Sequence, residues 1–282
     1  MYNARYHIAS LVAVFLALSL GLVLGGLVVR TGTVGRQQAA LVEGLRKEFS
    51  DLRTENDDLK SNNELLGSYS KAMTDSWSAE RLSGKTYVVL ASTGRTDGLK
   101  AVRAAIGVAG GKAAVVTILK PGLGLDDGAV RSQVASYAGG DGAGIEDRIS
   151  AALVREWSTP AGARPVTSAL TSAGVLTIDG LDASVAASGI VDIAATDGDA
   201  DPEGVALVKS AAALSLPGIG AELLGKASGV AAACAQAGGS GFDTLGTDVG
   251  RYTLIALLSG SEPGLYGVSD DATAAFPEPI AR

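Results

Sequence analysis

The sequence predicts an α/β protein with three parts in series: a transmembrane helix, a parallel coiled-coil helix and a mainly parallel α/β domain. An apolar run lies near the N-terminus, a charged segment with leucine at every seventh position follows it, and short apolar strands then alternate with helices. We expect a short cytoplasmic N-terminus at 1–7, the transmembrane helix at 8–29, the coiled coil at 36–82, the α/β domain at 84–267 and a tail at 268–282.

The composition of the 282 residues argues against several classes of function. The formal net charge is −7, whereas nucleic-acid binding needs clustered lysine and arginine, so we expect no nucleic-acid partner. His7, which precedes the apolar run, is the only histidine, and Cys234 is the only cysteine. Because the α/β domain lacks histidine, most common catalytic and metal-binding arrangements are missing from it. We therefore expect a protein that is not an enzyme and holds no cofactor.

The apolar run from Ile8 to Val29 is long enough to span a membrane, because a helix rises about 1.5 Å per residue and a hydrocarbon core is roughly 30 Å thick. The run continues past the small residues that resemble a cleavage site, so we expect a retained anchor rather than a cleaved signal peptide. A short N-terminus before one spanning helix is typical of a signal anchor and places the C-terminal bulk outside the cytoplasm. A single apolar helix also favours the inner membrane.

Small residues recur at every fourth position along this helix, and Gly21 and Gly25 form a GxxxG motif. Small side chains let two helices approach closely in lipid. Such residues are also common in spanning helices generally, so the motif gains weight only from the coiled coil that follows. Together the two features predict that two copies of the chain pair in parallel.

The segment from Gln37 to Glu80 carries the heptad pattern of a two-stranded coiled coil. Asn56 and Asn63 occupy two of the a positions, and leucines occupy the d positions Leu45, Leu52, Leu59 and Leu66. Leucine at d with asparagine at a is typical of a parallel dimer. The alternative is a single amphipathic helix packed on its own domain, but that arrangement produces a wider apolar stripe at 3.6-residue spacing.

The charges that flank the heptad stripe also favour a parallel homodimer. Glu48 at position g faces Arg53 at position e of a second copy, and Glu55 faces Lys60 in the same way. Both pairs have opposite sign. We therefore expect the chain itself to be one partner, with the membrane and an envelope protein as the others.

From Lys85 onward, short apolar strands alternate with helices. We expect strands at 86–91, 113–119, 175–178, 190–195 and 242–245, and helices at 97–108, 127–137, 145–157, 202–214 and 249–258. This alternation is typical of a Rossmann-like, mainly parallel sheet with helices on its faces. Asp201 is expected to cap the helix that begins at Pro202.

No dinucleotide fingerprint accompanies this fold. The turn after the first strand lacks GxGxxG, and the pattern that begins at Gly218 and Gly220 places Leu223 where its third small residue belongs. Cys234 lies in an alanine-rich segment, and we expect a buried and inert thiol there. Trp77 and Trp157 are expected to be packing residues.

Three aspartates at alternate positions, Asp197, Asp199 and Asp201, resemble the start of a calcium loop. The loop then fails, because Pro202 stands where glycine is needed and Val208 stands where glutamate is needed. The better interpretation is an acidic loop in front of a helix. A weak cation site at the three aspartates remains an alternative.

Two terminal segments resemble the actinobacterial MctB family of copper-transport outer-membrane proteins. The first comprises Tyr6-His7, the apolar residues 10–18 and the glycine-flanked residues 21–25, and the second comprises residues 256–258 with 264–267. The order of anchor, coil and α/β domain also matches. The resemblance implies a role in copper homeostasis at the envelope. Some relatives imply a different role, in daughter-cell separation with a membrane partner.

The residues themselves reveal no copper site within one chain. Copper(I) prefers cysteine and methionine and copper(II) prefers histidine, whereas His7, Met73 and Cys234 lie in separate regions of the sequence. Three hypotheses therefore remain open. The chain is a dimeric scaffold that presents its α/β domain to a partner, a copper transport factor, or a cation-dependent enzyme built on the three aspartates.

Overall fold

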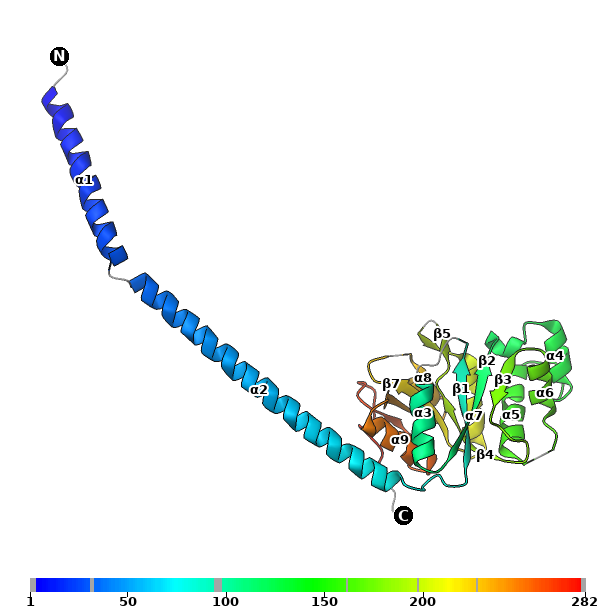
Figure 1. Cartoon of the computed structure of the whole chain (residues 1–282). Helices are drawn as coiled ribbons and strands as arrows, with labels where there is room; N and C mark the ends of the chain where they lie inside the picture. Colours follow the sequence, from blue (N-terminus) through cyan, green and yellow to red (C-terminus); the bar gives the residue numbers. More distant parts are fainter. Residues whose placement is uncertain are drawn as a thin grey trace. The chain divides into compact units, whose positions relative to one another are not determined.

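The protein is described by a computed structural model that covers residues 4–30, 33–93, 98–160, 162–196, 198–226 and 228–279. The chain divides into two compact units, Met1–Leu66 and Gly67–Arg282. The first unit holds helix α1 (Ala4–Arg30) and most of helix α2 (Thr33–Ser78) (Figure 1). The second unit holds the end of α2 and the α/β domain.

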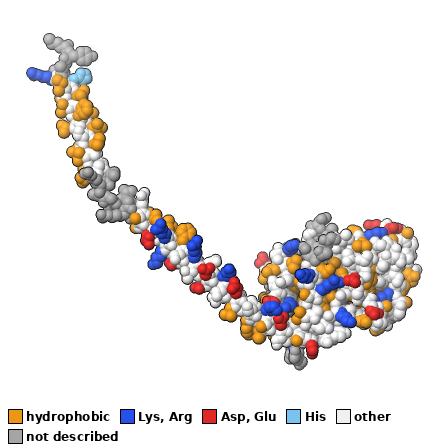
Figure 2. All heavy atoms as spheres, viewed as in Figure 1, with side chains coloured by type: hydrophobic (Ala, Val, Ile, Leu, Met, Phe, Trp, Pro, Cys, Tyr) orange, Lys and Arg blue, Asp and Glu red, His pale blue; other side chains and the backbone are white. Residues whose placement is uncertain are grey.

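Within the described residues, α1 is the one helix that is long and apolar enough to cross a membrane, judged by length and composition. The candidate span runs over Arg5–Leu27, close to the expected 8–29. Its apolar side chains are exposed along the helix (Figure 2). The helix begins at Ala4, so it includes most of the segment that we expected to precede it. This form is compatible with a single-pass anchor and with a signal sequence.

Helix α2 begins earlier and ends earlier than the sequence predicts. It starts at Thr33 rather than at residue 36, because helix propagation from the strong helix formers that follow outweighs the glycine at position 35. It ends at Ser78 rather than at residue 82. The turn that follows places Glu80 at a φ of 61°, which stops the helix.

The α/β domain is built on a mixed sheet whose described strands follow the order β3-β2-β1-β4-β7-β8-β9. Among these strands only β2 and β3 pair antiparallel. The bounds are β1 Thr86–Ser92, β2 Lys112–Ile118, β3 Leu176–Asp179, β4 Ala187–Asp192, β7 Gly218–Leu223, β8 Ser240–Leu245 and β9 Leu265–Tyr266. The short strands β5 (Ala195–Thr196) and β6 (Asp199–Ala200) form a separate antiparallel pair. The α/β class is confirmed, and the sheet is mixed.

Helices cover both faces of the sheet (Figure 1). One face carries α3 (Leu99–Val108) and α9 (Asp248–Leu258), which pack on Tyr87 and Val89 of β1. The other face packs on Val88 and Leu90 of the same strand. It carries η1 (Pro121–Gly124), α4 (Gly128–Ala135), α5 (Ile145–Ser158), α6 (Pro165–Ser172), α7 (Pro202–Ala213) and α8 (Val230–Gln236). Alternate side chains of a strand point to opposite faces, so β1 anchors both hydrophobic cores.

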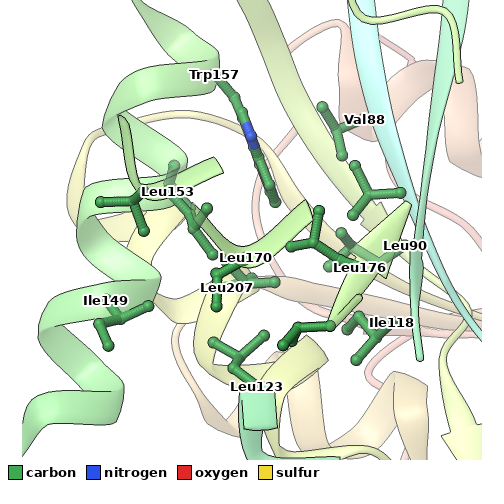
Figure 3. Packing of buried hydrophobic residues seen from close by; sticks show 14 of the residues in the cluster. Val88, Leu90, Ile118, Leu123, Ile149, Leu153, Trp157, Leu170, Leu176 and Leu207 are labelled. Carbon is green, nitrogen blue, oxygen red and sulfur yellow. The ribbon is translucent and has the colours of Figure 1, made fainter. Parts of the chain in front are cut away.

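The larger core is organised around α5. Ile149, Leu153 and Trp157 lie on one side of this helix and pack with Leu170 of α6 (Figure 3). The Trp157 ring is buried, and its Nε1 donates a hydrogen bond of 3.1 Å to Oγ1 of Thr167. The expectation that Trp157 is a packing residue is therefore confirmed.

The predicted strand at 190–195 was placed too late in the chain. Strand β4 runs over Ala187–Asp192, because the parallel register with β1 pairs Ala187 with Thr86 and Asp192 with Leu90. The apolar residues that follow, through Ala195, leave the sheet and remain buried beneath neighbouring segments. Helix α6, strand β7 and helix α8 were not predicted.

Candidate functional site

The most distinctive surface of the described chain is the row of exposed leucines on α2. The side chains at the predicted d positions, Leu45, Leu52, Leu59 and Leu66, are 53% to 63% exposed. Charged side chains of both signs lie along the same helix (Figure 2). Burying a narrow apolar stripe of this kind is the main driving force for helix pairing in water.

The remaining predicted dimerisation residues are also accessible. Asn56 and Asn63 are exposed on α2. A Cβ atom built at Gly21 or Gly25 of α1 would meet nothing within 4 Å, so another backbone can approach the helix there. The structure of one chain therefore leaves the dimerisation prediction untested.

A groove that sequence analysis did not predict lies where the end of α2 meets the α/β domain. It has a volume of about 360 Å³, and it is lined by Ser70, Met73, Thr74, Trp77, Val249, Tyr252, Phe276 and Pro279. The lining residues come from α2, from α9 and from the segment after β9. We call it the α2–α9 groove. Its walls are mainly apolar.

Aromatic contacts build one wall of the α2–α9 groove. The rings of Trp77 and Tyr252 lie 4.5 Å apart, and Phe276 meets Tyr252 edge-on at 5.9 Å. The Arg81 guanidinium lies 3.9 Å from the centre of the Trp77 ring. Tyr252 donates a hydrogen bond of 3.2 Å to the carbonyl oxygen of Pro277, which ties the C-terminal segment to α9. Trp77 is thus a packing residue, as expected.

An ion-pair network fixes the end of α2 against α9. Arg251 bridges Asp75 of α2 and Asp248 of its own helix, with nitrogen–oxygen distances of 2.9 Å to each. Asp75 also accepts a hydrogen bond of 2.7 Å from Lys71. These contacts hold the pKa of Asp75 below its usual value, the hydrogen bond from Lys71 being the largest cause. The groove is therefore braced by the polar contacts of Arg251.

The carboxyl end of β4 carries a fully buried carboxyl group. Asp192 accepts a hydrogen bond of 2.8 Å from the backbone amide of Ala194, and its Oδ2 lies 3.7 Å from Sγ of Cys234. Burial is the largest cause that raises the pKa of Asp192 to about 8. Cys234 is fully buried, and burial together with Asp192 raises the pKa of its thiol. The expected buried cysteine is confirmed.

The three aspartates of the predicted weak cation site occupy different environments. Asp197 lies outside the described residues, and Asp199 is exposed on β6. Asp201 stands at the N-cap position of α7, but the prediction that its side chain caps the helix is wrong. Its carboxylate instead accepts a hydrogen bond from the hydroxyl of Ser92, which draws it away from the helix amides.

A cavity of about 490 Å³ lies beside these residues, lined among others by Ser92, Asp199, Asp201 and Glu203. It lies at the carboxyl ends of β1 and β2. The strand order changes direction at β1, because β2 lies on one side of β1 and β4 lies on the other. Burial raises the pKa of Glu203. In the part of the chain that the structure describes, no group of three His, Cys, Asp or Glu side chains could hold a metal ion.

Among the described residues, the side chains that copper prefers do not assemble into a site within one chain. His7 lies on α1, Met73 on α2 and Cys234 on α8. Cys234 is also enclosed and held as the thiol, whereas copper(I) binds the thiolate. The described residues therefore do not fit a copper centre that one copy of the chain builds.

These features define a class of protein. Proteins of this class combine an N-terminal helix able to cross a membrane, a long charged helix with a leucine repeat, and an α/β domain, whose cysteine is buried in this chain. The chain belongs to the MctB family, described as "Copper transport outer membrane protein, MctB", whose model matches residues 1–277. No curated protein sequence and no solved structure matches the chain significantly. The resemblance at the two ends of the sequence is thus confirmed across nearly the whole chain.

Proposed function

We propose that this protein is a membrane-anchored envelope scaffold. Two copies pair through α2 as a parallel coiled coil, and each presents a non-catalytic α/β domain to a protein partner. The observation that carries the proposal is the row of exposed leucines on α2, together with asparagine at two a positions. A single-chain protein gains nothing from such a row, whereas a dimer buries it.

The family description supports a role in copper transport or homeostasis at the envelope. We propose that the chain serves this role through its partner rather than by holding copper itself. The inaccessible thiol of Cys234 and the scattered positions of His7 and Met73 support this division of labour. The anchor and the expected orientation make the partner an envelope protein, with the α/β domain outside the cytoplasm.

The buried carboxyl group of Asp192 supports a structural role rather than a catalytic one. Asp192 is enclosed by the core and holds the chain after β4 through the amide of Ala194. Asp201 is engaged by Ser92, which links the ends of β1 and β6. A general acid or base needs access to a substrate, and Asp192 has none.

The test is to purify the full chain in detergent, to measure its protein mass by light scattering and to titrate it with copper(I) and copper(II) by calorimetry. We expect a dimer without a stoichiometric copper site. Leu59→Asp should yield monomers, whereas Leu65→Asp should not. Leu65 is similarly exposed on α2 but occupies position c, away from the seam.

Three results would contradict the proposal. A monomeric wild-type chain would remove the coiled coil, and a tight copper site with one ion per chain would make the protein a copper carrier. Equal behaviour of Leu59→Asp and Leu65→Asp would show that any dimer forms through another surface.

A further inference from the structure

We propose that the α2–α9 groove receives the side chain of Tyr69 from a second copy of this chain. The dimer interface would then extend from the coiled coil onto the α/β domain. This inference rests on the proposed parallel pairing of α2. It adds a second contact region, a specific anchoring residue and a fixed orientation of each α/β domain toward the partner helix.

The first step is the heptad register of the groove. The leucine series at position d continues to Met73, which places Ser70 and Trp77 at a and Thr74 at e. These four residues are the ones that α2 contributes to the groove. In a two-stranded coil, positions a and d face the partner helix and position e flanks it. The groove therefore opens toward the side of α2 where a second copy would lie.

The second step identifies the side chain that would reach the groove. In a parallel coil, a residue at g lies beside the residue five positions later, at e of the partner. The rule that pairs Glu48 with Arg53 also pairs Tyr69 with Thr74. Thr74 is itself covered by its own chain, but its neighbour Met73, which also lines the groove, is 50% exposed, and Tyr69 is 63% exposed on its own chain. Tyr69 of the second copy is thus directed to the groove.

The third step is the match between Tyr69 and the walls of the groove. Met73 and Phe276 are each 50% exposed there, and Tyr252 offers an aromatic face between Trp77 and Phe276. An additional aromatic ring would bury these apolar surfaces and stack against the existing pair. Its hydroxyl can stay at the open end of the groove and contact water.

The charge pattern selects a second copy as the occupant. Along the earlier heptads, acidic residues at g face basic residues at e, which complements an identical parallel helix. At the level of the groove, these positions change to Gly67, Tyr69, Thr74 and Ser76, none of which is charged. The same helix therefore supplies opposite charges where it would meet a charged helix, and an uncharged face where it would meet an apolar groove.

The interface would also be closed by symmetry. In a two-fold dimer each chain provides one groove and one Tyr69, so the same contact forms twice. Because Arg251 and its two ion pairs hold the end of α2 against α9, the groove is already formed before the second copy arrives. Preorganisation of this kind reduces the ordering cost of binding.

The experiment uses cysteine crosslinking of full-length chains in detergent. One tagged chain carries Tyr69→Cys, and a second chain with a different tag carries Val249→Cys in the groove. As a control, the second chain carries Tyr137→Cys, an exposed position on the opposite face of the sheet. The native thiol of Cys234 is buried, so it does not compete. Leu59→Cys, at a d position, reports the coiled coil separately.

We expect disulfide-linked heterodimers from Tyr69→Cys with Val249→Cys and none with Tyr137→Cys. Tyr69→Ala should raise the dissociation constant of the dimer by about tenfold to a hundredfold, as loss of an aromatic anchor does, while Tyr137→Ala leaves it unchanged. If Leu59→Cys crosslinks and the groove pair does not, the groove inference is wrong and the coil survives. A crosslinked coil without a crosslinked groove pair would mean that the groove is empty or holds a different protein. If neither crosslinks, the proposed dimer fails as well.

Discussion

Replacing the buried carboxyl group of Asp192 with an amide should remove much of the pH dependence of stability. Asp192→Asn preserves the shape of the side chain and the acceptor for the amide of Ala194. The raised pKa of about 8 means that the folded protein keeps a proton on Asp192 across most of the neutral range. The unfolded chain releases this proton near its ordinary value of 3.8.

The sign and size of the effect follow from this difference. A raised folded-state pKa contributes stability that is fully present below the unfolded pKa and is lost as pH rises through the folded pKa. Between about pH 4 and pH 8, the free energy of unfolding should fall by up to about 1.4 kcal/mol per pH unit. The raised pKa of Glu203 acts in the same direction and leaves a smaller slope in the variant. Asp75 and Asp182 have lowered pKa values, so their contributions are lost only at more acidic pH.

The assay is denaturant unfolding of both proteins at pH 5, 6, 7 and 8, followed by tryptophan fluorescence, to which the buried Trp157 contributes. We expect the stability advantage of Asp192→Asn over the wild type to grow steadily from pH 5 to pH 8. The upper estimate of that advantage is about 4 kcal/mol over this range. A wild-type slope no steeper than that of the variant would refute the assignment of a protonated carboxyl group to this site.

Three further substitutions test the packing of the α/β domain. Leu153→Ala should lower the free energy of unfolding by about 2–5 kcal/mol, because Leu153 is fully buried in the larger core; denaturant unfolding measures this. Arg148 donates hydrogen bonds to four carbonyl oxygens of residues 138–143. Arg148→Ala should therefore speed amide hydrogen exchange in that loop but not in β1. Unchanged exchange in the loop would show that Arg148 does not hold it in place. A Cβ at Gly241 would overlap a carbonyl group of α8, so Gly241→Ala should lower the melting temperature. Gly128→Ala is the control: its new Cβ would have no atom within 4 Å, so the melting temperature should change little.

Strands β1 and β2 were predicted because their sequences contain apolar runs. Strand β1 is buried along its whole length, and its apolar run is visible in the sequence. Strand β7 escaped prediction because Gly218 and Gly220 interrupt its apolar pattern. A Cβ at Gly220 would overlap the carbonyl oxygen of Val230, so this glycine lets α8 pack on the sheet. The need for glycine at this position arises from a contact between β7 and α8, which the sequence alone does not reveal.

Helix α6 and the α2–α9 groove were missed for a related reason. The first amides of α6 are capped by the carboxylate of Glu156 from α5, with distances of 2.8 Å to Val166 and 2.9 Å to Thr167. No capping residue within α6 signals its start. The groove joins Trp77 to Tyr252, which only the fold brings together. By contrast, the leucine repeat of α2 is periodic, so the sequence alone predicts it.

Distances between spin labels on α2 test the parallel dimer most directly. Single cysteines at Lys47, Thr54 and Ser61 all occupy position f, on the side away from the seam, and can be labelled in the full-length chain in detergent. A parallel dimer predicts the same short distance between the two copies at all three positions. An antiparallel dimer would produce distances that change from one position to the next. A monomer would produce no interchain distance, and either result would contradict the proposed scaffold.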